Sequence, residues 1–313
     1  MNFITMEQLN RCIYENINKI PQDIDLVVGI PRSGSFVANM LALYRNLPYT
    51  SIDGYVEKRK LRAGNTRKCV GWIQRVEQAK KVLVVDDSIS SGRALKEAKR
   101  LIKESGMKAE HLYLAVYALE NNLHLVDLYF EVCHMPRVFE WNYMHSWVLE
   151  YCCVDIDGVL CEDPSFLDND DGKRYRRFLL NAKPKMLPTK KVGYIVTARL
   201  EKYREETEAW LRRHGVLYGH LVMLGAASGK ERRRQGSHGA FKGSVFQRTN
   251  CSLFIESSYE QAVEICKVAG KQVFCTDRNV LITPQGIGKH LKILANDWRF
   301  TSRRVVKKLL KKI

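Results

Sequence analysis

The sequence predicts an α/β protein with two doubly wound parallel-sheet domains. Two strand-like runs, Val82–Val85 and Leu149–Val154, are each followed at once by two carboxylates. Open α/β sheets bind ligands at the carboxyl ends of such strands, so each run predicts a site as well as a strand. The chain has 313 residues, 45% of them hydrophobic, which is enough to form two separate cores.

The composition limits the compartment and the class of partner. The formal net charge of +17 calls for an anionic partner, such as a phosphate ester, nucleic acid or an acidic membrane face. Nucleic acid is the least favoured of these, because zinc-finger spacings and aromatic RNA-binding motifs are absent from the sequence. Nine scattered cysteines without a CxxC pair indicate reduced core residues of a cytoplasmic protein. Glu7, Arg11 and Glu15 interrupt any secretory apolar core.

The first hundred residues predict alternating helices and strands. We expect a helix over residues 2–19, a strand over 25–30, a helix over 36–44, a strand over 49–55, a strand at Val82–Val85 and a helix over 93–104. The turn between the first strand and the second helix, residues 31–35, contains Arg32, Ser33 and Gly34. A Gly/Ser turn that opens a helix is an anion-binding corner, with Arg32 as an added cation.

The stretch from Val82 to Arg93 carries the most specific motif of this half. The apolar strand ends in Asp86 and Asp87, and a Ser/Gly run then opens the next helix. This pattern resembles the 5-phosphoribosyl-1-diphosphate (PRPP) signature of type I phosphoribosyltransferases. The resemblance implies ribose contacts from the two carboxylates, phosphate contacts from the loop, and diphosphate contacts from the first turn. The implied PRPP-binding residues are Arg32, Ser33, Gly34, Asp86, Asp87, Ser88, Ile89, Ser90, Ser91 and Gly92.

Two further stretches of the first domain each leave two interpretations open. Residues 57–68 carry six cations and form either a solvated loop or a hood that closes over the diphosphate. After expected strands at 111–119 and 125–133, residues 139–147 are unusually aromatic. They form either packing between domains or an acceptor platform, in which Glu140 or His145 would be the base.

The first motif of the second half follows an expected strand directly. It reads Asp155-Ile156-Asp157-Gly158-Val159-Leu160. This sequence resembles motif I of the haloacid dehalogenase superfamily of phosphatases. The resemblance implies that Asp155 attacks phosphorus and that Asp157 protonates the leaving oxygen and later deprotonates water. Gly158 permits a sharp turn after Asp157, which lets both aspartates point at the same place.

Later segments resemble the remaining motifs of that superfamily in the right order. Thr197, after the strand Val192–Val196, would bind the phosphoryl group, and Lys242 would be the motif III lysine, with Lys230 as the alternative. Glu256 would hold Mg²⁺ together with Asp155 and the backbone carbonyl of Asp157. The family commonly has a second acidic residue where this chain has Ser257. Forty positions separate Asp157 from Thr197, which predicts a minimal cap and an open site.

Two basic segments follow. Residues 229–235 contain Lys230 and three arginines, and predict a solvated surface or a second phosphate contact. The chain ends in residues 301–313, where apolar and cationic residues alternate at helical spacing. This amphipathic helix either docks on the domain or lies on anionic lipid at the inner face of the membrane.

We therefore expect domains at residues 1–148 and 149–300, followed by the basic helix 301–313. The combination resembles the dual-domain ribofuranosyltransferases of bacterial surface polysaccharide synthesis. It implies Mg²⁺-dependent transfer of 5-phosphoribosyl from PRPP to a lipid-linked glycan, then removal of the 5-phosphate. A nucleobase phosphoribosyltransferase with an independent phosphatase, and a PRPP-sensing regulatory protein, are the alternatives.

Overall fold

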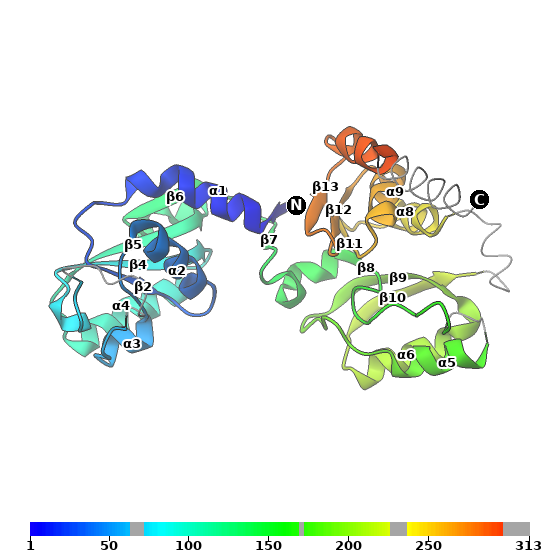
Figure 1. Ribbon diagram of the computed structural model, residues 1–313, viewed down its shortest axis with the longest axis horizontal. Helices are drawn as coiled ribbons and strands as arrows, with labels where there is room; N and C mark the ends of the chain where they lie inside the picture. Colours follow the sequence, from blue (N-terminus) through cyan, green and yellow to red (C-terminus); the bar gives the residue numbers. More distant parts are fainter. Residues whose placement is uncertain (63–71, 169–171, 226–236, 297–313) are drawn as a thin grey trace, which may run out of the picture. The chain divides into compact units, whose positions relative to one another are not determined.

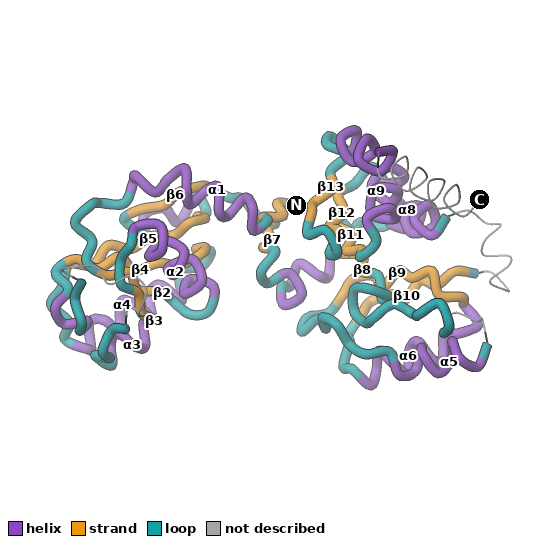
Figure 2. The backbone as a smooth tube through the Cα atoms, viewed as in Figure 1, coloured by secondary structure: helices purple, strands orange, loops and turns teal. Residues whose placement is uncertain are grey.

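The computed structural model describes residues 1–62, 72–168, 172–225 and 237–296. The chain divides into two compact units after Trp141, and each is described by itself. The N-terminal unit is Asn2–Trp141, and the C-terminal unit begins at Asn142 and includes Met1. The expected boundary after residue 148 lies seven residues further along. Both units are α/β structures with mainly parallel sheets, as the sequence predicts (Figures 1 and 2).

The N-terminal unit is organised around a fully parallel five-stranded sheet. The strand order is β3-β2-β4-β5-β6, which puts β4 in the centre. The strands are β2 (Leu26–Gly29), β3 (Tyr49–Ser51), β4 (Lys81–Ile89), β5 (Glu110–Ala118) and β6 (Leu128–Val132). A separate parallel pair joins β1 (Asn2–Ile4) to β7 (Arg137–Phe139).

Helices cover both faces of this sheet. They are α1 (Met6–Asn16), α2 (Ser33–Arg45), α3 (Ile52–Val56) and α4 (Arg93–Ser105). Leu83 and Val85 of β4 pack in a cluster with apolar residues of α1 and α2. Val82 and Val84 pack in a second cluster with residues of α3 and α4. Successive strand residues face opposite sides, so the unbroken apolar run of β4 is explained by burial on both faces.

Several expected bounds in this unit are wrong. The helix expected to start at Phe36 begins at Ser33, and the strand expected to end at Val85 continues to Ile89. Two other bounds differ because of capping hydroxyls. Residues 2–4 are a strand rather than the start of the helix, because they pair with β7 and Thr5 caps α1 with its side chain. The strand expected over 49–55 ends at Ser51, whose hydroxyl accepts from Gly54 N and starts α3. In both places a capping hydroxyl ends the strand at a position that apolar periodicity does not reveal.

The C-terminal unit contains a six-stranded sheet in the order β10-β9-β8-β11-β12-β13. Its strands are β8 (Cys152–Val154), β9 (Val192–Leu200), β10 (Tyr218–Leu224), β11 (Leu253–Glu256), β12 (Gln272–Cys275) and β13 (Val280–Ile282). The strand pairs are parallel except that β13 runs antiparallel to β12 at one edge. The strand expected over 149–154 is shorter, because Trp147–Tyr151 is a 3₁₀ helix.

Helices flank this sheet on both faces as well. They are α5 (Lys173–Asn181), α6 (Arg204–Arg213), α8 (His238–Arg248) and α9 (Tyr259–Ala269), and residues 287–296 are also helical. Residues of α8 and α9 pack with Phe254 of β11. Tyr175 and Leu179 of α5 pack instead with Leu200 of β9. In Figure 1, α5 and α6 lie below β9 and β10. Between Asp157 and Thr197, α5 is the α-helix that the described residues form.

Several expected features fall outside the described residues. These are residues 63–68 of the expected hood, the basic stretch 229–235 with Lys230, and the amphipathic tail 301–313. Within the described ranges, no helix is both long enough and apolar enough to cross a bilayer. The eight cysteines in these ranges are buried and unpaired, as expected for core thiols.

The junction between β1 and α1 provides a test of the capping box. Gln8 N donates to Thr5 Oγ1 at 3.2 Å, and Thr5 N donates to Gln8 Oε1 at 2.9 Å. Replacing Thr5 by Ala should lower the free energy of unfolding by about 1 kcal/mol, because an N-cap acceptor is lost. Thr5→Ser retains the hydroxyl and should retain most of the stability. Urea unfolding measures both, and equal losses would show that the cap is not the cause.

Candidate functional site

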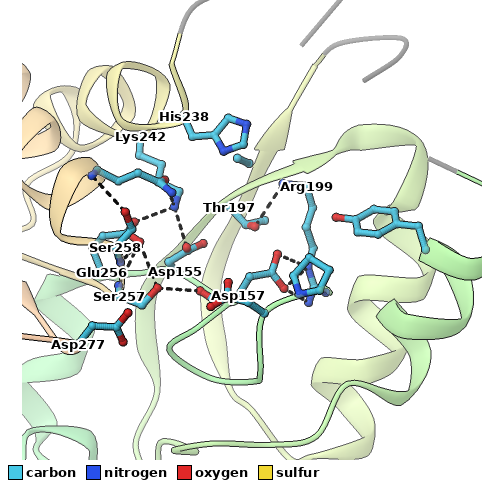
Figure 3. A pocket seen from close by; sticks show the side chains of 15 residues that line it. Asp155, Asp157, Thr197, Arg199, His238, Lys242, Glu256, Ser257, Ser258 and Asp277 are labelled. Carbon is cyan, nitrogen blue, oxygen red and sulfur yellow. Dashed lines mark hydrogen bonds and ion pairs between the residues drawn. The ribbon is translucent and has the colours of Figure 1, made fainter. Parts of the chain in front are cut away.

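A polar site of the C-terminal unit lies at the carboxyl ends of three neighbouring strands. Asp155 follows β8, Thr197 lies in β9, and Glu256 ends β11. Because β8 is paired with β9 on one side and β11 on the other, these ends meet at the point where the strand order reverses. Their side chains line a cavity of about 170 Å³ (Figure 3).

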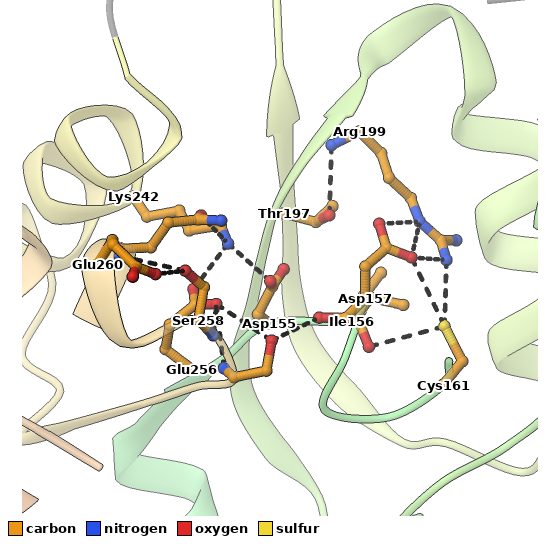
Figure 4. Close-up of polar contacts among 12 residues, drawn as sticks. Asp155, Ile156, Asp157, Cys161, Thr197, Arg199, Lys242, Glu256, Ser258 and Glu260 are labelled. Atoms are coloured by element: carbon orange, nitrogen blue, oxygen red, sulfur yellow. Dashed lines mark hydrogen bonds and ion pairs between the residues drawn. The ribbon is translucent and has the colours of Figure 1, made fainter. Parts of the chain in front are cut away.

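A buried lysine holds this cavity together. Lys242 of α8 is 2% exposed, and its ammonium group has three acceptors (Figure 4). Nζ donates to Asp155 Oδ2 at 2.6 Å, to Glu256 Oε2 at 2.7 Å and to Gln261 Oε1 at 2.8 Å. An ammonium group has three hydrogens, so this one is fully satisfied. Of the two sequence candidates, Lys242 is therefore brought to Asp155, while Lys230 lies outside the described residues.

The protonation of this cluster follows from burial and charge. Burial raises the pKa of Asp155, and the ammonium group of Lys242 opposes this shift. Burial also raises the pKa of Glu256, to about 7, with the charge of Asp155 acting in the same direction. For Lys242, burial would lower the pKa, but the charges of Asp155 and Glu256 outweigh it and raise the pKa. One cation thus serves two buried carboxylates.

The second oxygen of Asp155 differs from the first. Asp155 Oδ1 is buried and has no hydrogen-bond partner among the described residues, whereas Oδ2 is held by Lys242. Asp155 is 4% exposed, and an unpaired carboxylate oxygen in such a site is costly. Thr197 is also buried, and its hydroxyl accepts from Arg199 N at 3.3 Å. Both residues line the cavity.

The predicted metal ligands fit this arrangement only in part. Glu256 Oε1 accepts from Ser257 N at 3.0 Å and Ser258 N at 3.1 Å, and Oε2 is held by Lys242. Among the described residues, no group of three or more His, Cys, Asp or Glu side chains is arranged to hold a metal ion. Protein donors hold Asp155 Oδ2 and both oxygens of Glu256, so the expected three-residue Mg²⁺ set does not fit as arranged.

The carboxylate of Asp157 is held by an arginine that sequence reasoning did not assign. Arg199 lies in β9 with a fully buried side chain. Its Nη2 donates to Asp157 Oδ1 at 2.6 Å, and its Nε lies 3.1 Å from Oδ2. Figure 4 shows the fork-shaped contact. The charge of Asp157 raises the pKa of Arg199 against the effect of burial, and the contact is a two-pronged salt bridge. Asp157 is therefore turned toward Arg199 in this conformation.

In the N-terminal unit, the expected PRPP residues meet at the carboxyl edge of β4. A Cβ atom added at Gly34 would lie 2.7 Å from Val85 O and 3.0 Å from Asp86 Oδ1. The first turn of α2 therefore packs directly on Asp86, which only glycine permits. Arg32 precedes α2 and is exposed, and Ser33 is the first residue of the helix. The helix N-terminus and Asp86 thus lie side by side.

The stretch called here the signature loop, residues 86–92, consists of the last residues of β4, up to Ile89, and the short turn that leads into α4. Gly92 has φ = +72° at the N-cap of α4, a conformation that favours glycine. Ser90 and Ser91 are exposed, and Ser88 is partly buried, so these hydroxyls line the outside of the turn. Ile89 is buried, and the carbonyl of Ser90 accepts from Asn122 Nδ2. The loop therefore presents polar groups outward from an anchored apolar residue.

The two carboxylates of this loop have different surroundings. Asp87 is 5% exposed, and its Oδ2 accepts from Trp141 Nε1 at 2.8 Å. Asp86 is partly exposed, and its Oδ1 accepts from Asp87 N at 2.9 Å. Burial and the charge of Asp87 raise the pKa of Asp86 to about 8. Burial also raises the pKa of Asp87, and the bond from Trp141 opposes this shift.

Sequence reasoning missed several residues that complete both sites. Arg199, Gln261, Arg137 and Trp141 each hold a predicted site residue or its backbone. Arg199 offered a signal, because an arginine inside the apolar strand Val192–Leu200 requires a buried carboxylate partner. The others act across long sequence separations, and nothing in the local pattern marks them.

The aromatic stretch 139–147 is shared between the two units. Phe139 stacks on Trp141 at 4.7 Å within the N-terminal unit, and Tyr143 contacts Phe274 within the C-terminal unit. Of the two candidate bases, Glu140 accepts from Met6 N through Oε2 at 2.8 Å. The Nδ1 of His145 lies 3.0 Å from Thr189 Oγ1. Each candidate base therefore already has a hydrogen-bond partner: Glu140 a backbone N–H group, and His145 a threonine hydroxyl.

Comparison with known proteins finds similarities in the first half of the chain. Residues 4–146 match the family model described as the phosphoribosyl transferase domain. The amidophosphoribosyltransferase of Lachancea kluyveri is 30% identical over 138 residues, covering 40% of this chain and 27% of that protein. The Homo sapiens amidophosphoribosyltransferase is 31% identical over 114 residues, covering 34% and 22%. Residues 4–146 are therefore similar to phosphoribosyl transferase domains.

These relatives leave the rest of the chain unmatched. The chain spans about a quarter of the length of the curated relatives that it matches. A purine phosphoribosyltransferase structure from Pyrococcus horikoshii covers 45% of this chain and 92% of its own, with 18% identity and a TM-score of 0.33. At this TM-score the structural likeness adds nothing to the sequence match.

The raised pKa of Asp86 predicts a pH-dependent stability. A carboxyl group whose pKa rises from near 4 in the unfolded chain to about 8 in the folded one binds more protons when folded. Its contribution to stability therefore falls as the pH rises between these values. Asp86→Asn should remove this loss, so the variant should be more stable than the wild type at pH 8.5 and gain less at pH 5. Urea unfolding at both pH values measures this, with the exposed Asp53→Asn as control. Equal gains at the two pH values would contradict the prediction.

Proposed function

We propose that the N-terminal unit transfers a 5-phosphoribosyl group from PRPP to an acceptor. The observation that carries this proposal is the match of residues 4–146 to the phosphoribosyl transferase domain, together with Asp86 packed against Gly34 at the carboxyl edge of β4. This edge offers carboxylate acceptors for ribose hydroxyls next to a helix N-terminus and Arg32 for the diphosphate. The donor is expected to enter as its Mg²⁺ complex.

The transfer step would be a displacement at C1 of the ribose. A bond forms between the acceptor oxygen and C1, the bond from C1 to the diphosphate oxygen breaks, and diphosphate leaves with the electron pair. Because PRPP has the α configuration, direct attack gives a β-ribofuranoside. In this chain Asp86 would orient the sugar, and the first turn of α2 would hold the leaving diphosphate. The acceptor proton goes to a base that the described contacts do not identify.

We propose that the C-terminal unit hydrolyses a phosphate ester as a haloacid dehalogenase-like phosphatase. The support is the unpartnered Oδ1 of Asp155 in the cavity, with Oδ2 fixed by Lys242. Oδ1 would attack phosphorus, the bond between phosphorus and the ester oxygen would break, and Asp157 would protonate that oxygen. Water would then hydrolyse the aspartyl phosphate and return a proton to Asp157. Thr197 would bind the phosphoryl group, and Asp157 would have to turn from Arg199 to act.

The proposed transfer and phosphatase steps are compatible if they act one after the other on the same product. A salvage enzyme needs the 5′-phosphate of its nucleotide, and a fused phosphatase would destroy that product. A ribose without phosphate is the product that both steps favour. We therefore propose two-step ribofuranosyl transfer to a glycan acceptor, lipid-linked at the inner membrane face, in bacterial surface polysaccharide synthesis. Membrane contact through residues 301–313 rests on the sequence pattern alone.

Replacement of both donor carboxylates tests the first activity. The double variant Asp86→Asn with Asp87→Asn should abolish PRPP consumption, because the ribose hydroxyls lose both carboxyl groups that would accept from them. Phosphatase activity on a supplied phosphoribosyl product should persist. Release of diphosphate measures the first step, and mass analysis of products with glycan or nucleobase acceptors identifies the acceptor. Unchanged diphosphate release would remove the PRPP proposal, and transfer to a base would replace the glycan.

Replacement of the proposed nucleophile tests the second activity. Asp155→Asn should leave PRPP consumption intact while the product accumulates with one additional phosphate. The phosphatase rate should fall by several powers of ten, since the covalent intermediate cannot form. Asp168→Asn, a change at a partly exposed carboxylate of the same unit, is the control. Phosphate-free product at the wild-type rate would exclude Asp155 as the nucleophile.

A further inference from the structure

Residues 137–141, called here the strap, contact the signature loop from within the N-terminal unit. The strap consists of β7 and the two residues that follow it, Glu140 and Trp141. It lies about 50 residues after the loop in the sequence, and it contacts the loop at two points. Neither contact was expected from the motifs.

The first contact fixes the end of β4. Arg137 is 6% exposed, and its Nη2 donates to Ile89 O at 2.8 Å while Nη1 donates to Cys133 O at 3.0 Å. A buried guanidinium group that bridges two carbonyls ties the start of the loop to the segment after β6. Arg137 thus sets the position of the backbone from which residues 90–92 extend.

The second contact fixes a side chain of the loop. Trp141 Nε1 donates to Asp87 Oδ2 at 2.8 Å, and the indole ring stacks on Phe139 at 4.7 Å with an interplanar angle of 21°. An indole has one donor, so the ring orientation decides which atom receives it. Because the ring is held by stacking, the donor is aimed at Asp87 before any ligand arrives.

The strap itself is held at its other edge. Its residues Arg137, Val138 and Phe139 pair in parallel with Asn2–Ile4. Glu140 N then donates to Ile4 O at 2.9 Å, and Glu140 Oε2 accepts from Met6 N at 2.8 Å. The carboxylate of Glu140 thus lies at the first turn of α1, where negative charge is favourable. The strap is a fixed support rather than a free surface segment.

From this geometry we infer that Trp141 is a positioning residue for PRPP, which acts by orienting Asp87, with Arg137 fixing the loop behind it. The inference rests on the proposed PRPP-dependent transfer and names residues that lie outside its signature. A second effect acts in the same direction: burial raises the pKa of Asp87, whereas the bond from Trp141 and the charge of Arg137 lower it. The strap therefore both aims the carboxylate and favours its ionised form, which accepts hydroxyl donors best.

Trp141→Phe tests this inference because it keeps a ring on Phe139 and removes only the donor. The full-length variant should bind PRPP, in the presence of Mg²⁺, about tenfold more weakly or worse, since one hydrogen bond to a buried carboxylate is lost. The maximal rate at saturating PRPP should change by less than about threefold, because the donor acts on binding. Calorimetric titration and initial rates measure the two quantities.

A double-mutant cycle separates positioning from general support. In an Asp87→Ala background, Trp141→Phe should cause no further loss of PRPP affinity, because its only route of action is gone. Additive losses would overturn the inference. Val138→Ala, in the same strap, should lower the melting temperature and leave PRPP affinity unchanged. Should Trp141→Phe not fold, Arg137→Lys, which loses the bridge to Ile89 and Cys133, should weaken PRPP binding without a change in maximal rate.

The controls also distinguish this inference from the proposed function. Trp147→Phe changes a half-exposed indole of the C-terminal unit and should bind PRPP as the wild type does. A wild type that does not bind PRPP would overturn the proposed transfer, and the positioning role with it. A wild type that binds PRPP, beside a Trp141→Phe variant of equal affinity, would overturn the positioning role alone.

Discussion

The energetic problem that both sites share is the burial of carboxylates at the end of a parallel sheet. A buried carboxylate must be paired with donors or cations, or it takes up a proton. Parallel strands that are covered on both faces leave only their carboxyl ends for polar groups. The sheet thus brings acidic residues together at the place where the ligand is expected, and surrounding residues must balance their charges.

The two units balance these charges in different ways. In the C-terminal unit, Lys242 serves Asp155 and Glu256, and Arg199 serves Asp157. This network leaves one oxygen, Asp155 Oδ1, without a partner among the described residues. In the N-terminal unit, the more buried carboxylate, Asp87, accepts a hydrogen bond from the indole of Trp141. Asp86 lies beside the charge of Asp87, and its pKa is raised to about 8. In the C-terminal site, the cations of the protein compensate most of the carboxylate charge. In the N-terminal site, much of that charge is left uncompensated.

The site residues that local sequence patterns mark could be predicted, whereas their charge-balancing partners from distant parts of the chain could not. The strands and their acidic ends were predictable, because apolar runs of β-branched residues and a following DD or DxD are local patterns. The resemblance to phosphatase motifs indicated Thr197 and Lys242, the latter with Lys230 as the alternative. The partners Arg137 and Trp141 were not predictable, because they reach the loop from about 50 residues away. The wrong strand and helix bounds near Thr5 and Ser51 arose from capping hydroxyls, whose effect depends on which neighbouring strand is present.

The incomplete site has a thermodynamic consequence for the N-terminal unit. Asp86 and Asp87 cost stability near neutral pH, because each has a pKa raised by burial and Asp86 has it raised further by its neighbour. A ligand that supplies hydroxyl donors and a cation to this pair removes part of that cost on binding, so it stabilises the folded unit by linkage. The C-terminal cluster gains less from a ligand, because Lys242 and Arg199 already provide the compensating charge. We therefore expect ligands to bind where carboxyl groups lack compensating partners among the described residues. These places are the edge of β4 beside Gly34, and Asp155 Oδ1.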